Sequence, residues 1–337
     1  MKAMLSVDPG GPDSLALMEV PEPALRKGGL LVRVEACAIN YPDVLIIEDK
    51  YQIKPARPFA PGGEIAGIVE AVGAGVEGWQ IGDRIIAVIG YGGLAQRVVL
   101  DASRAYRLPE KITADRGAAL LLTYATALHA LTDRGHIRQG DTLLVLGAAG
   151  GVGLAAAEVG KLLGARVIAA VSSEEKAAAA REIGVDGVLI YPRDAAGTSA
   201  KDLAAMFKSA VGEAGANVIV DPVGGDYAEP ALRAIAWEGR YLVLGFPAGI
   251  PKLPLNLPLL KSCDICGVYW GAFALREPQR ARAEVDQLLQ WLENGQIAPR
   301  ISKIWPLEKA AEAISHMASR QAIGKLIVTV PMAGPAN

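Results

Sequence analysis

A glycine-rich turn between an apolar strand and an apolar helix is the segment of this chain best suited to hold a phosphate. The predicted strand Thr142–Leu146 runs into Gly147 and a Gly-Gly-Val-Gly sequence, and a predicted helix, 154–163, follows. Glycines let the backbone approach a pyrophosphate, and the first N–H groups of a helix attract an anion. Because strand, turn and helix occur in this order, the segment predicts a dinucleotide site. Its expected contact residues are Ala148, Gly150, Gly151, Val152 and Gly153.

The end of the next predicted strand, Arg166–Val171, indicates which dinucleotide would bind. An acidic residue there is typical of NAD sites, where it contacts the ribose, but this chain continues with Ser172-Ser173 and then Lys176. Hydroxyl and ammonium groups, with Tyr191 after the third strand, can hold a 2′-phosphate. The pattern therefore favours NADPH as the cofactor. Glu174 and Glu175 leave open a ribose contact, and a solvated surface role for Lys176 is the alternative.

Two kinds of pattern divide the 337 residues. Up to about Leu108 the chain reads as short strands bounded by Gly, Pro or Asp, which predicts an all-β region. From about Thr113, apolar strands alternate with Ala- and Leu-rich helical segments, which predicts a doubly wound parallel sheet. We expect a first domain over 1–122, a cofactor domain over 123–262, and a return to the first domain over 263–337. The proline-rich loop Pro247–Pro258 is expected to mark that return.

Composition excludes several classes of function. The net charge of -2 offers no basic surface for nucleic acid, and no apolar run is long enough to span a bilayer. Three cysteines are too few for a disulfide framework, and the single Cys263-x-x-Cys266 pair lacks the ligand count of a zinc site. We therefore expect a cytoplasmic protein with neither nucleic-acid binding nor membrane insertion.

Seven segments along nearly the whole chain resemble the zinc-independent medium-chain dehydrogenases/reductases, and in particular the quinone oxidoreductases. Besides the glycine turn, the matching segments are 38–43 (AINYPD), 61–67 (PGGEIAG), 82–84 (GDR), 122–127 (LTYATA), 221–225 (DPVGG) and 324–325 (GK). The resemblance implies a GroES-like β domain and a Rossmann cofactor domain, with the active site in the cleft between them. It also implies a homodimer formed through the Rossmann-domain edge around Cys266–Ala272.

The same resemblance assigns roles to individual residues. Zinc-dependent relatives have a cysteine and a histidine where this chain has Asn40 and Gly63, which cannot replace a thiolate and an imidazole, so no metal is expected. Asn40, Asp43, Tyr51 and Thr126 are expected to line the nicotinamide and acceptor pocket, with Tyr51 as the candidate proton donor. Tyr51 packing in the cleft wall is the alternative. Further cofactor contacts are expected from Val223, Gly245, Phe246 and Lys325.

The function implied is reduction of a small activated acceptor by NADPH. Without a metal to polarise a carbonyl, alcohol dehydrogenation is unattractive, whereas a quinone accepts hydride because its oxygen takes up the negative charge. An enoyl-thioester or enone reductase is the alternative enzyme. A non-catalytic NADPH-binding protein, comparable to zinc-lacking relatives that serve as lens crystallins, is the alternative outside catalysis.

Overall fold

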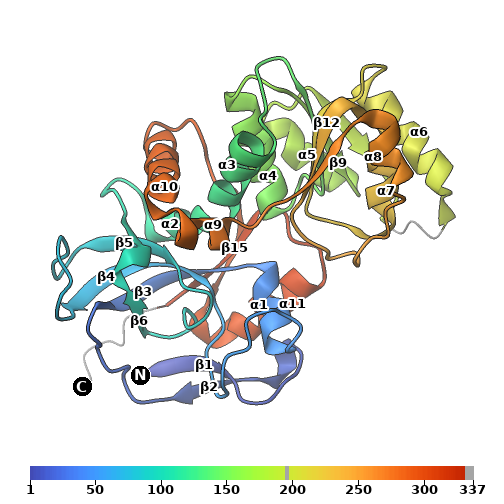
Figure 1. Cartoon of the computed structure of the whole chain (residues 1–337). Helices are drawn as coiled ribbons and strands as arrows, with labels where there is room; N and C mark the ends of the chain where they lie inside the picture. Colours follow the sequence, from blue (N-terminus) through green and yellow to red (C-terminus); the bar gives the residue numbers. More distant parts are fainter. Residues whose placement is uncertain (194–196, 331–337) are drawn as a thin grey trace. The chain divides into compact units, whose positions relative to one another are not determined.

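The computed structural model describes residues 1–193 and 197–330, which form two compact units. Unit 1 contains Met1–Leu122 together with the described residues from Leu289 onward, and unit 2 contains Thr123–Leu288. In Figure 1, unit 1 is blue to teal with the red C-terminal segments, and unit 2 runs from green to orange. Within the described residues, no helix combines the length and the apolar composition needed to cross a bilayer.

Unit 1 is built on a seven-stranded sheet in the order β14-β15-β3-β4-β5-β7, with β6 also paired to β3. All its neighbouring strands are antiparallel except β14 and β15. The final strand pairs with β3, which confirms the prediction that it rejoins the N-terminal β region. The strands of unit 1 are β1 (Lys2–Ser6), β2 (Leu15–Glu19), β3 (Gly29–Ile39), β4 (Glu64–Val72), β5 (Arg84–Val88), β6 (Arg97–Asp101), β7 (Ala105–Arg107), β14 (Ile301–Pro306) and β15 (Lys325–Thr329).

Short helices cover this sheet and bring distant parts of the chain together. They are α1 (Tyr41–Ile47), α2 (Ala114–Ala118) and α11 (Ala310–Ala318). The apolar residues of α1 and α11 join one buried core with those of β3, β4 and β15. As Figure 1 shows, the red α11 lies beside the blue α1, so the C-terminal segment completes the N-terminal unit. The end of β3 and the start of α1 are thereby held next to β15.

Unit 2 is a six-stranded parallel sheet in the order β10-β9-β8-β11-β12-β13. The chain order reverses between β8 and β11, and ligands of doubly wound sheets bind at the carboxyl ends of strands at such a point. The strands are β8 (Thr142–Leu146), β9 (Arg166–Val171), β10 (Gly187–Ile190), β11 (Ala216–Asp221), β12 (Ile235–Val243) and β13 (Asp264–Gly267). The helices are α3 (Thr126–His129), α4 (Gly151–Leu162), α5 (Glu174–Glu182), α6 (Ala200–Val211), α7 (Ala228–Leu232), α8 (Asn256–Lys261), α9 (Trp270–Arg276) and α10 (Pro278–Glu293), the last of which continues into unit 1 from Leu289. The expected α/β fold class, a β domain plus a Rossmann-type sheet, is confirmed.

The segment after residue 262 differs from the sequence-based expectation. The chain does not leave unit 2 at the proline-rich loop, because β13 follows that loop and pairs with β12 as the outermost strand of the parallel sheet. Residues through Leu288 stay with unit 2. The apolar pattern of β13 covers only four residues. A pattern this short does not distinguish a strand from a loop by its periodicity.

Candidate functional site

The glycine turn of unit 2 ends at the uncapped beginning of helix α4. Gly150 is the N-cap residue, has an extended backbone and supplies no side-chain cap. The first N–H groups of a helix lack intrahelical acceptors, and the helix dipole places partial positive charge there. This end of α4 is therefore suited to an anionic group, which is the requirement of a dinucleotide pyrophosphate.

The glycines of this turn meet different neighbours. A Cβ atom on Gly153 would lie 2.3 Å from the Gly147 carbonyl oxygen, so this position has no room for a side chain. A Cβ on Gly150 would meet only that same oxygen, at 3.4 Å, an ordinary contact. Gly147 has a φ of 56°, in the left-handed region that favours glycine. Gly153 therefore lets the helix pack closely on the turn, whereas Gly150 faces space that the protein leaves open.

The other predicted turn residues pack around these glycines. Ala148 is fully buried and donates its backbone N–H to the Ala170 carbonyl oxygen, 3.1 Å away, so its small side chain fits beneath the turn. Gly151 and Val152 begin helix α4 and are half-buried. The alanine at the first position of the fingerprint is thus compatible with the turn.

Lys176 and Arg193, which follow β9 and β10, are close enough for their positive charges to interact. The Lys176 ammonium is 3.4 Å from the Ser172 hydroxyl, and the Ser173 hydroxyl accepts the Lys176 backbone N–H at the start of α5. Burial lowers the pKa of Lys176, and the nearby positive charge of Arg193 lowers it further, while Glu175 raises it. Neighbouring like charges favour an anion between them. Arg193 is a residue that the sequence reasoning missed, although its place two residues after Tyr191 was a usable signal.

Tyr191 lies behind the glycine turn rather than in solvent. It is 5% exposed, and its ring packs 4.9 Å from that of Tyr227 between centroids. Burial raises the pKa of its hydroxyl, while a hydrogen bond with the Gly147 backbone lowers it in part. Tyr191 therefore supports the turn, and its direct contact with a phosphate stays a prediction.

The ends of β11 and β12 carry the remaining predicted cofactor residues of unit 2. The buried Asp221 carboxylate accepts the backbone N–H groups of Val223 and Gly224, each at 2.8 Å, and the Tyr241 hydroxyl at 2.5 Å. Burial raises the pKa of Asp221 despite these three donors. Gly245 and Phe246 follow β12, and Phe246 is exposed. In a parallel sheet these residues share the edge that carries the glycine turn.

A buried polar cluster in unit 1 contains the predicted pocket residue Asn40 and the predicted cofactor contact Lys325. The Lys325 ammonium donates to Asn40 Oδ1 at 2.7 Å and to Glu64 Oε2 at 2.8 Å. The Asn40 amide nitrogen donates to the same Glu64 oxygen at 3.0 Å. Lys325 therefore lies in the β unit, with two N–H groups held by protein acceptors. A cofactor contact by this residue would depend on its third N–H group and stays a prediction.

Asp43 fixes the backbone beside this cluster. Its carboxylate accepts the Asn40 backbone N–H at 2.8 Å and that of Gly62 at 3.0 Å, which joins the start of α1 to the segment before β4. Burial raises the pKa of Asp43 to about 6, and the two backbone donors and Lys325 oppose that rise. Asp43 is 2% exposed, so its carboxylate holds the backbone of these two segments together and does not face solvent.

The other two predicted pocket residues lie in different units. Tyr51 follows α1 in unit 1, is half-buried and packs against the apolar core of that unit. Thr126 begins α3 in unit 2, between the π-helical turns η3 (Leu121–Ala125) and η4 (Ala130–Arg134). Wider π turns frequently occur at functional sites. The convergence of Tyr51 and Thr126 stays a prediction.

The residues at the expected zinc-ligand positions do not suit a metal. Gly63 has no donor atom, and a Cβ there would lie 2.9 Å from the Gly90 carbonyl oxygen, so a histidine would require the backbone to move. Asn40 already contacts the Lys325 ammonium, a cation supplied by the protein. All three cysteines are buried and free, and burial raises the pKa of Cys37 well above its usual value.

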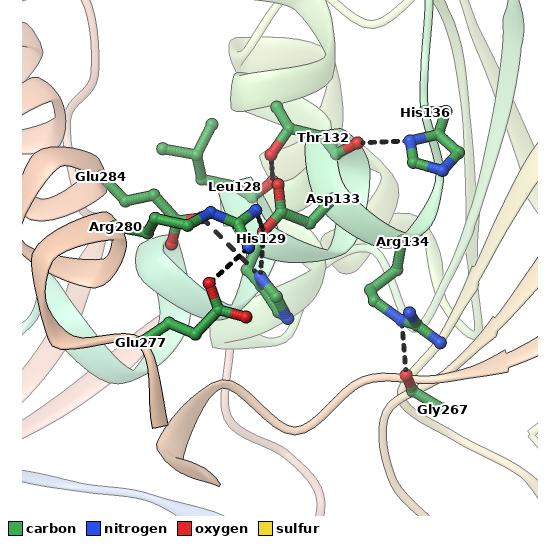
Figure 2. A network of polar contacts seen from close by, with 10 residues as sticks. All are labelled: Leu128, His129, Thr132, Asp133, Arg134, His136, Gly267, Glu277, Arg280 and Glu284. Atoms are coloured by element: carbon green, nitrogen blue, oxygen red, sulfur yellow. Dashed lines mark hydrogen bonds and ion pairs between the residues drawn. The ribbon is translucent and has the colours of Figure 1, made fainter. Parts of the chain in front are cut away.

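Among the described residues, one group of three side chains has the spacing of a metal site: His129, Asp133 and Glu284 in unit 2. Figure 2 shows that Arg280 points into this group and donates to Asp133 at 2.7 Å. His129 Nδ1 lies 3.1 Å from Asp133, and its ring stacks on Phe273 at 4.1 Å. A guanidinium thus already supplies positive charge to these carboxylates, and His129 packs between Asp133 and the Phe273 ring as a buried side chain.

Comparisons with known proteins agree with this architecture. The family model "Alcohol dehydrogenase GroES-like domain" matches residues 26–110, and "Zinc-binding dehydrogenase" matches residues 151–294. The "Quinone oxidoreductase-like protein 2 homolog" of Nematostella vectensis is 38% identical over 88% of this chain and 80% of its own length. The "Quinone oxidoreductase" of Rattus norvegicus is 31% identical over 97% of each chain. The structure of Escherichia coli quinone oxidoreductase complexed with NADPH superposes with a TM-score of 0.90 at 26% identity, over 98% of this chain and 100% of that one.

The first matched family model covers part of the β unit and the second covers most of the parallel-sheet unit. The sequence identity to the relatives extends across both units. The glycine turn, the Asp221 loop and the Asn40–Asp43 segment, which carried the resemblance in the sequence, all lie at the sites described above. The chain therefore belongs to the quinone oxidoreductase family of the medium-chain dehydrogenases/reductases.

Proposed function

We propose that this oxidoreductase uses NADPH to reduce quinones or related activated carbonyl acceptors, without zinc. The observation that carries the cofactor assignment is the Lys176 ammonium beside the Ser172 hydroxyl at the end of β9, with the positive charge of Arg193 close enough to act on Lys176. An NAD site would place a carboxylate there. The NADPH complex of the Escherichia coli relative supports the same choice.

The chain's own residues define what the site does. The start of α4 and the basic pair of Lys176 and Arg193 hold the negatively charged parts of the cofactor. The Asp221 carboxylate keeps the neighbouring Val223 loop in place. A bound NADPH supplies the hydride. Tyr51 offers a hydroxyl that can donate a proton to the reduced acceptor; an enolate carbon needs such a donor, whereas a quinone oxygen can receive its proton from water. Oxidation of NADPH in the presence of a quinone panel tests this function, and no oxidation with any quinone or enone would favour a non-catalytic protein.

The cofactor preference depends on Lys176. We expect NADPH to bind more tightly than NADH, and Lys176→Ala to weaken NADPH binding by about 1.5–3 kcal/mol because a charge-assisted contact is lost. NADH binding should change little, since it has no 2′-phosphate. Fluorescence titration of both cofactors measures this difference.

Lys161→Ala is the matched control for that titration. Lys161 lies on α4 and pairs with Asp186 at 2.8 Å, so its replacement removes the same charge away from the basic pair. NADPH affinity should stay at the wild-type value in this variant. Equal affinity of the wild-type protein for NADPH and NADH would contradict the assignment, as would equal losses in both lysine variants.

Zinc should be dispensable. Protein purified without added metal is expected to contain far less than stoichiometric zinc, and chelator treatment should leave quinone turnover unchanged, because Asn40 and Gly63 offer no ligand pair. Elemental analysis together with turnover before and after dialysis against a chelator measures both. Stoichiometric zinc whose removal abolishes turnover would disprove zinc independence.

We also propose that the protein forms a homodimer through β13. This strand is the outermost of its sheet on that side, and Ile265 on it is 38% exposed. An exposed strand edge with apolar side chains favours pairing with another chain. Ile265→Lys should shift the mass measured by light scattering from dimer towards monomer. Ile190→Lys, on the opposite edge strand β10 and 39% exposed, is the control and should remain dimeric. A monomeric wild-type protein would disprove the dimer.

A further inference from the structure

The buried cluster of unit 1 fixes the Asn40 amide in one orientation. Lys325 has only donor hydrogens, so the Asn40 atom 2.7 Å from its ammonium must be the oxygen. The nitrogen then faces two acceptors, Glu64 Oε2 at 3.0 Å and the Ala38 carbonyl oxygen at 3.3 Å. Rotating the amide by 180° would set donor against donor at Lys325 and oxygen against oxygen at Glu64. That orientation is therefore strongly disfavoured.

This orientation limits what Asn40 can offer a ligand. An asparagine amide has two N–H donors, and both already have protein acceptors. The side chain therefore has no N–H group left to donate to a ligand. A ligand contact must use Oδ1 as an acceptor. Asn40 is 7% exposed, whereas Glu64 is 0% and Lys325 is 3% exposed. Asn40 is therefore the most exposed residue of the cluster.

We propose that Glu64 and Lys325 are positioning residues that hold Asn40 as a hydrogen-bond acceptor in the active site. This inference rests on the proposed function. It assigns to Asn40 a ligand group that donates a hydrogen bond, such as a hydroxyl of the reduced acceptor, and excludes it as a donor to the quinone oxygen. Stabilising that oxygen then falls to another hydrogen-bond donor.

The positions of the three side chains explain why the cluster can act as one unit. Asn40 follows β3, Glu64 begins β4 and Lys325 begins β15, three strands that are neighbours in the sheet. The second Glu64 oxygen accepts the Leu122 backbone N–H at 2.8 Å, at the end of the first segment of unit 1. Every described partner of the carboxylate is a donor, so its charge is matched in a site closed to water.

The experiment compares Lys325→Met, Glu64→Gln and the double variant by urea unfolding and by kinetics. Each single change leaves a buried group without its counter-charge and should lower the unfolding midpoint by roughly 1 M or more. The double variant removes both charges and should recover most of that loss. In the double variant, the new side-chain amide at position 64 can donate to Asn40 Oδ1. The Asn40 amide can therefore rotate by 180° into the orientation that is disfavoured in the wild type. We therefore expect kcat to stay about a hundredfold low, as misplacement in an active site can cost.

NADPH affinity separates this role from a cofactor contact by Lys325. Affinity measured by fluorescence titration should stay close to wild type in the folded double variant, because the phosphate-binding residues lie in unit 2. Recovery of kcat together with stability would overturn the proposal and make the pair merely structural. Selective loss of NADPH binding would overturn it in favour of a direct cofactor contact.

The unfolding measurements also distinguish this proposal from the proposed function. A double-mutant cycle between Asn40→Ala and Lys325→Met reports their coupling whether or not the protein turns over a quinone. Coupling in a protein that reduces no acceptor would reject the proposed function but support the proposal that Glu64 and Lys325 position Asn40. Absence of coupling in a protein that reduces quinones would reject only the positioning role of Glu64 and Lys325.

Discussion

Tyr51→Phe is expected to lower turnover of an α,β-unsaturated carbonyl by about 10²–10⁴-fold, the usual contribution of a positioned general acid. Hydride addition to an enone leaves an enolate whose carbon must receive a proton, and phenylalanine keeps the ring while removing the proton. A reduced quinone bears oxygen anions that water can protonate. Its turnover should therefore stay within roughly tenfold of wild type, or about 1.4 kcal/mol of barrier.

The comparison needs a second tyrosine from the same unit as a control. Tyr91 is 42% exposed and contacts Phe59 edge-on, with ring centroids 5.8 Å apart. Tyr91→Phe removes a hydroxyl from the surface of unit 1 and should leave both activities unchanged. Collapse of quinone turnover in a folded, NADPH-binding Tyr51→Phe protein would contradict this division and make the hydroxyl necessary for both reactions. Equal, small losses with both acceptors would reduce Tyr51 to a packing residue.

Local patterns in the sequence were sufficient to predict the fold class and the strand and helix on either side of the expected cofactor loop. The strand before Gly147 and the helix after it are both in the structure, although α4 begins at Gly151, three residues earlier than the apolar pattern suggested. Helix ends depend on backbone hydrogen bonds rather than on apolar periodicity, so glycines can begin a helix without an apolar signal. Helix α10 (Pro278–Glu293) shows the converse case, because its amphipathic pattern continues over several turns and such a pattern is recognisable in a sequence.

Features that depend on distant contacts were not predictable in this way. Lys325 and Glu64 are separated by 261 positions in the chain, and nothing near either residue indicates that they form a buried pair. The sequence reasoning assigned Lys325 to the cofactor because of its motif, without information about its partners. Likewise Asp221 was recognised only as part of a motif, whereas the buried Tyr241 that donates to it lies 20 residues further on. Such pairs are fixed by sheet order, which a single sequence does not specify.

The two glycines of the cofactor loop should fail in different ways when each is replaced by alanine. Gly153→Ala is expected to lower the free energy of unfolding by about 1–3 kcal/mol or more, because the new Cβ would meet the Gly147 carbonyl oxygen at 2.3 Å and a main-chain atom cannot easily withdraw. Gly150→Ala should leave stability nearly unchanged. Its backbone, with a φ of -74° and a ψ of 168°, suits any residue, and its Cβ would meet that oxygen only at 3.4 Å.

Gly150→Ala, which should hardly change stability, should lower the affinity for the cofactor. The space beside Gly150 is the space that a pyrophosphate needs at the start of α4, so a methyl group there should weaken NADPH binding by at least about tenfold, or about 1.4 kcal/mol. Urea unfolding and NADPH titration of the two variants measure both effects. A Gly150→Ala protein that binds NADPH as tightly as wild type would mean that the pyrophosphate does not approach this turn. A stable Gly153→Ala protein would mean that α4 can move away from the turn, and that close packing is not what requires glycine at this position.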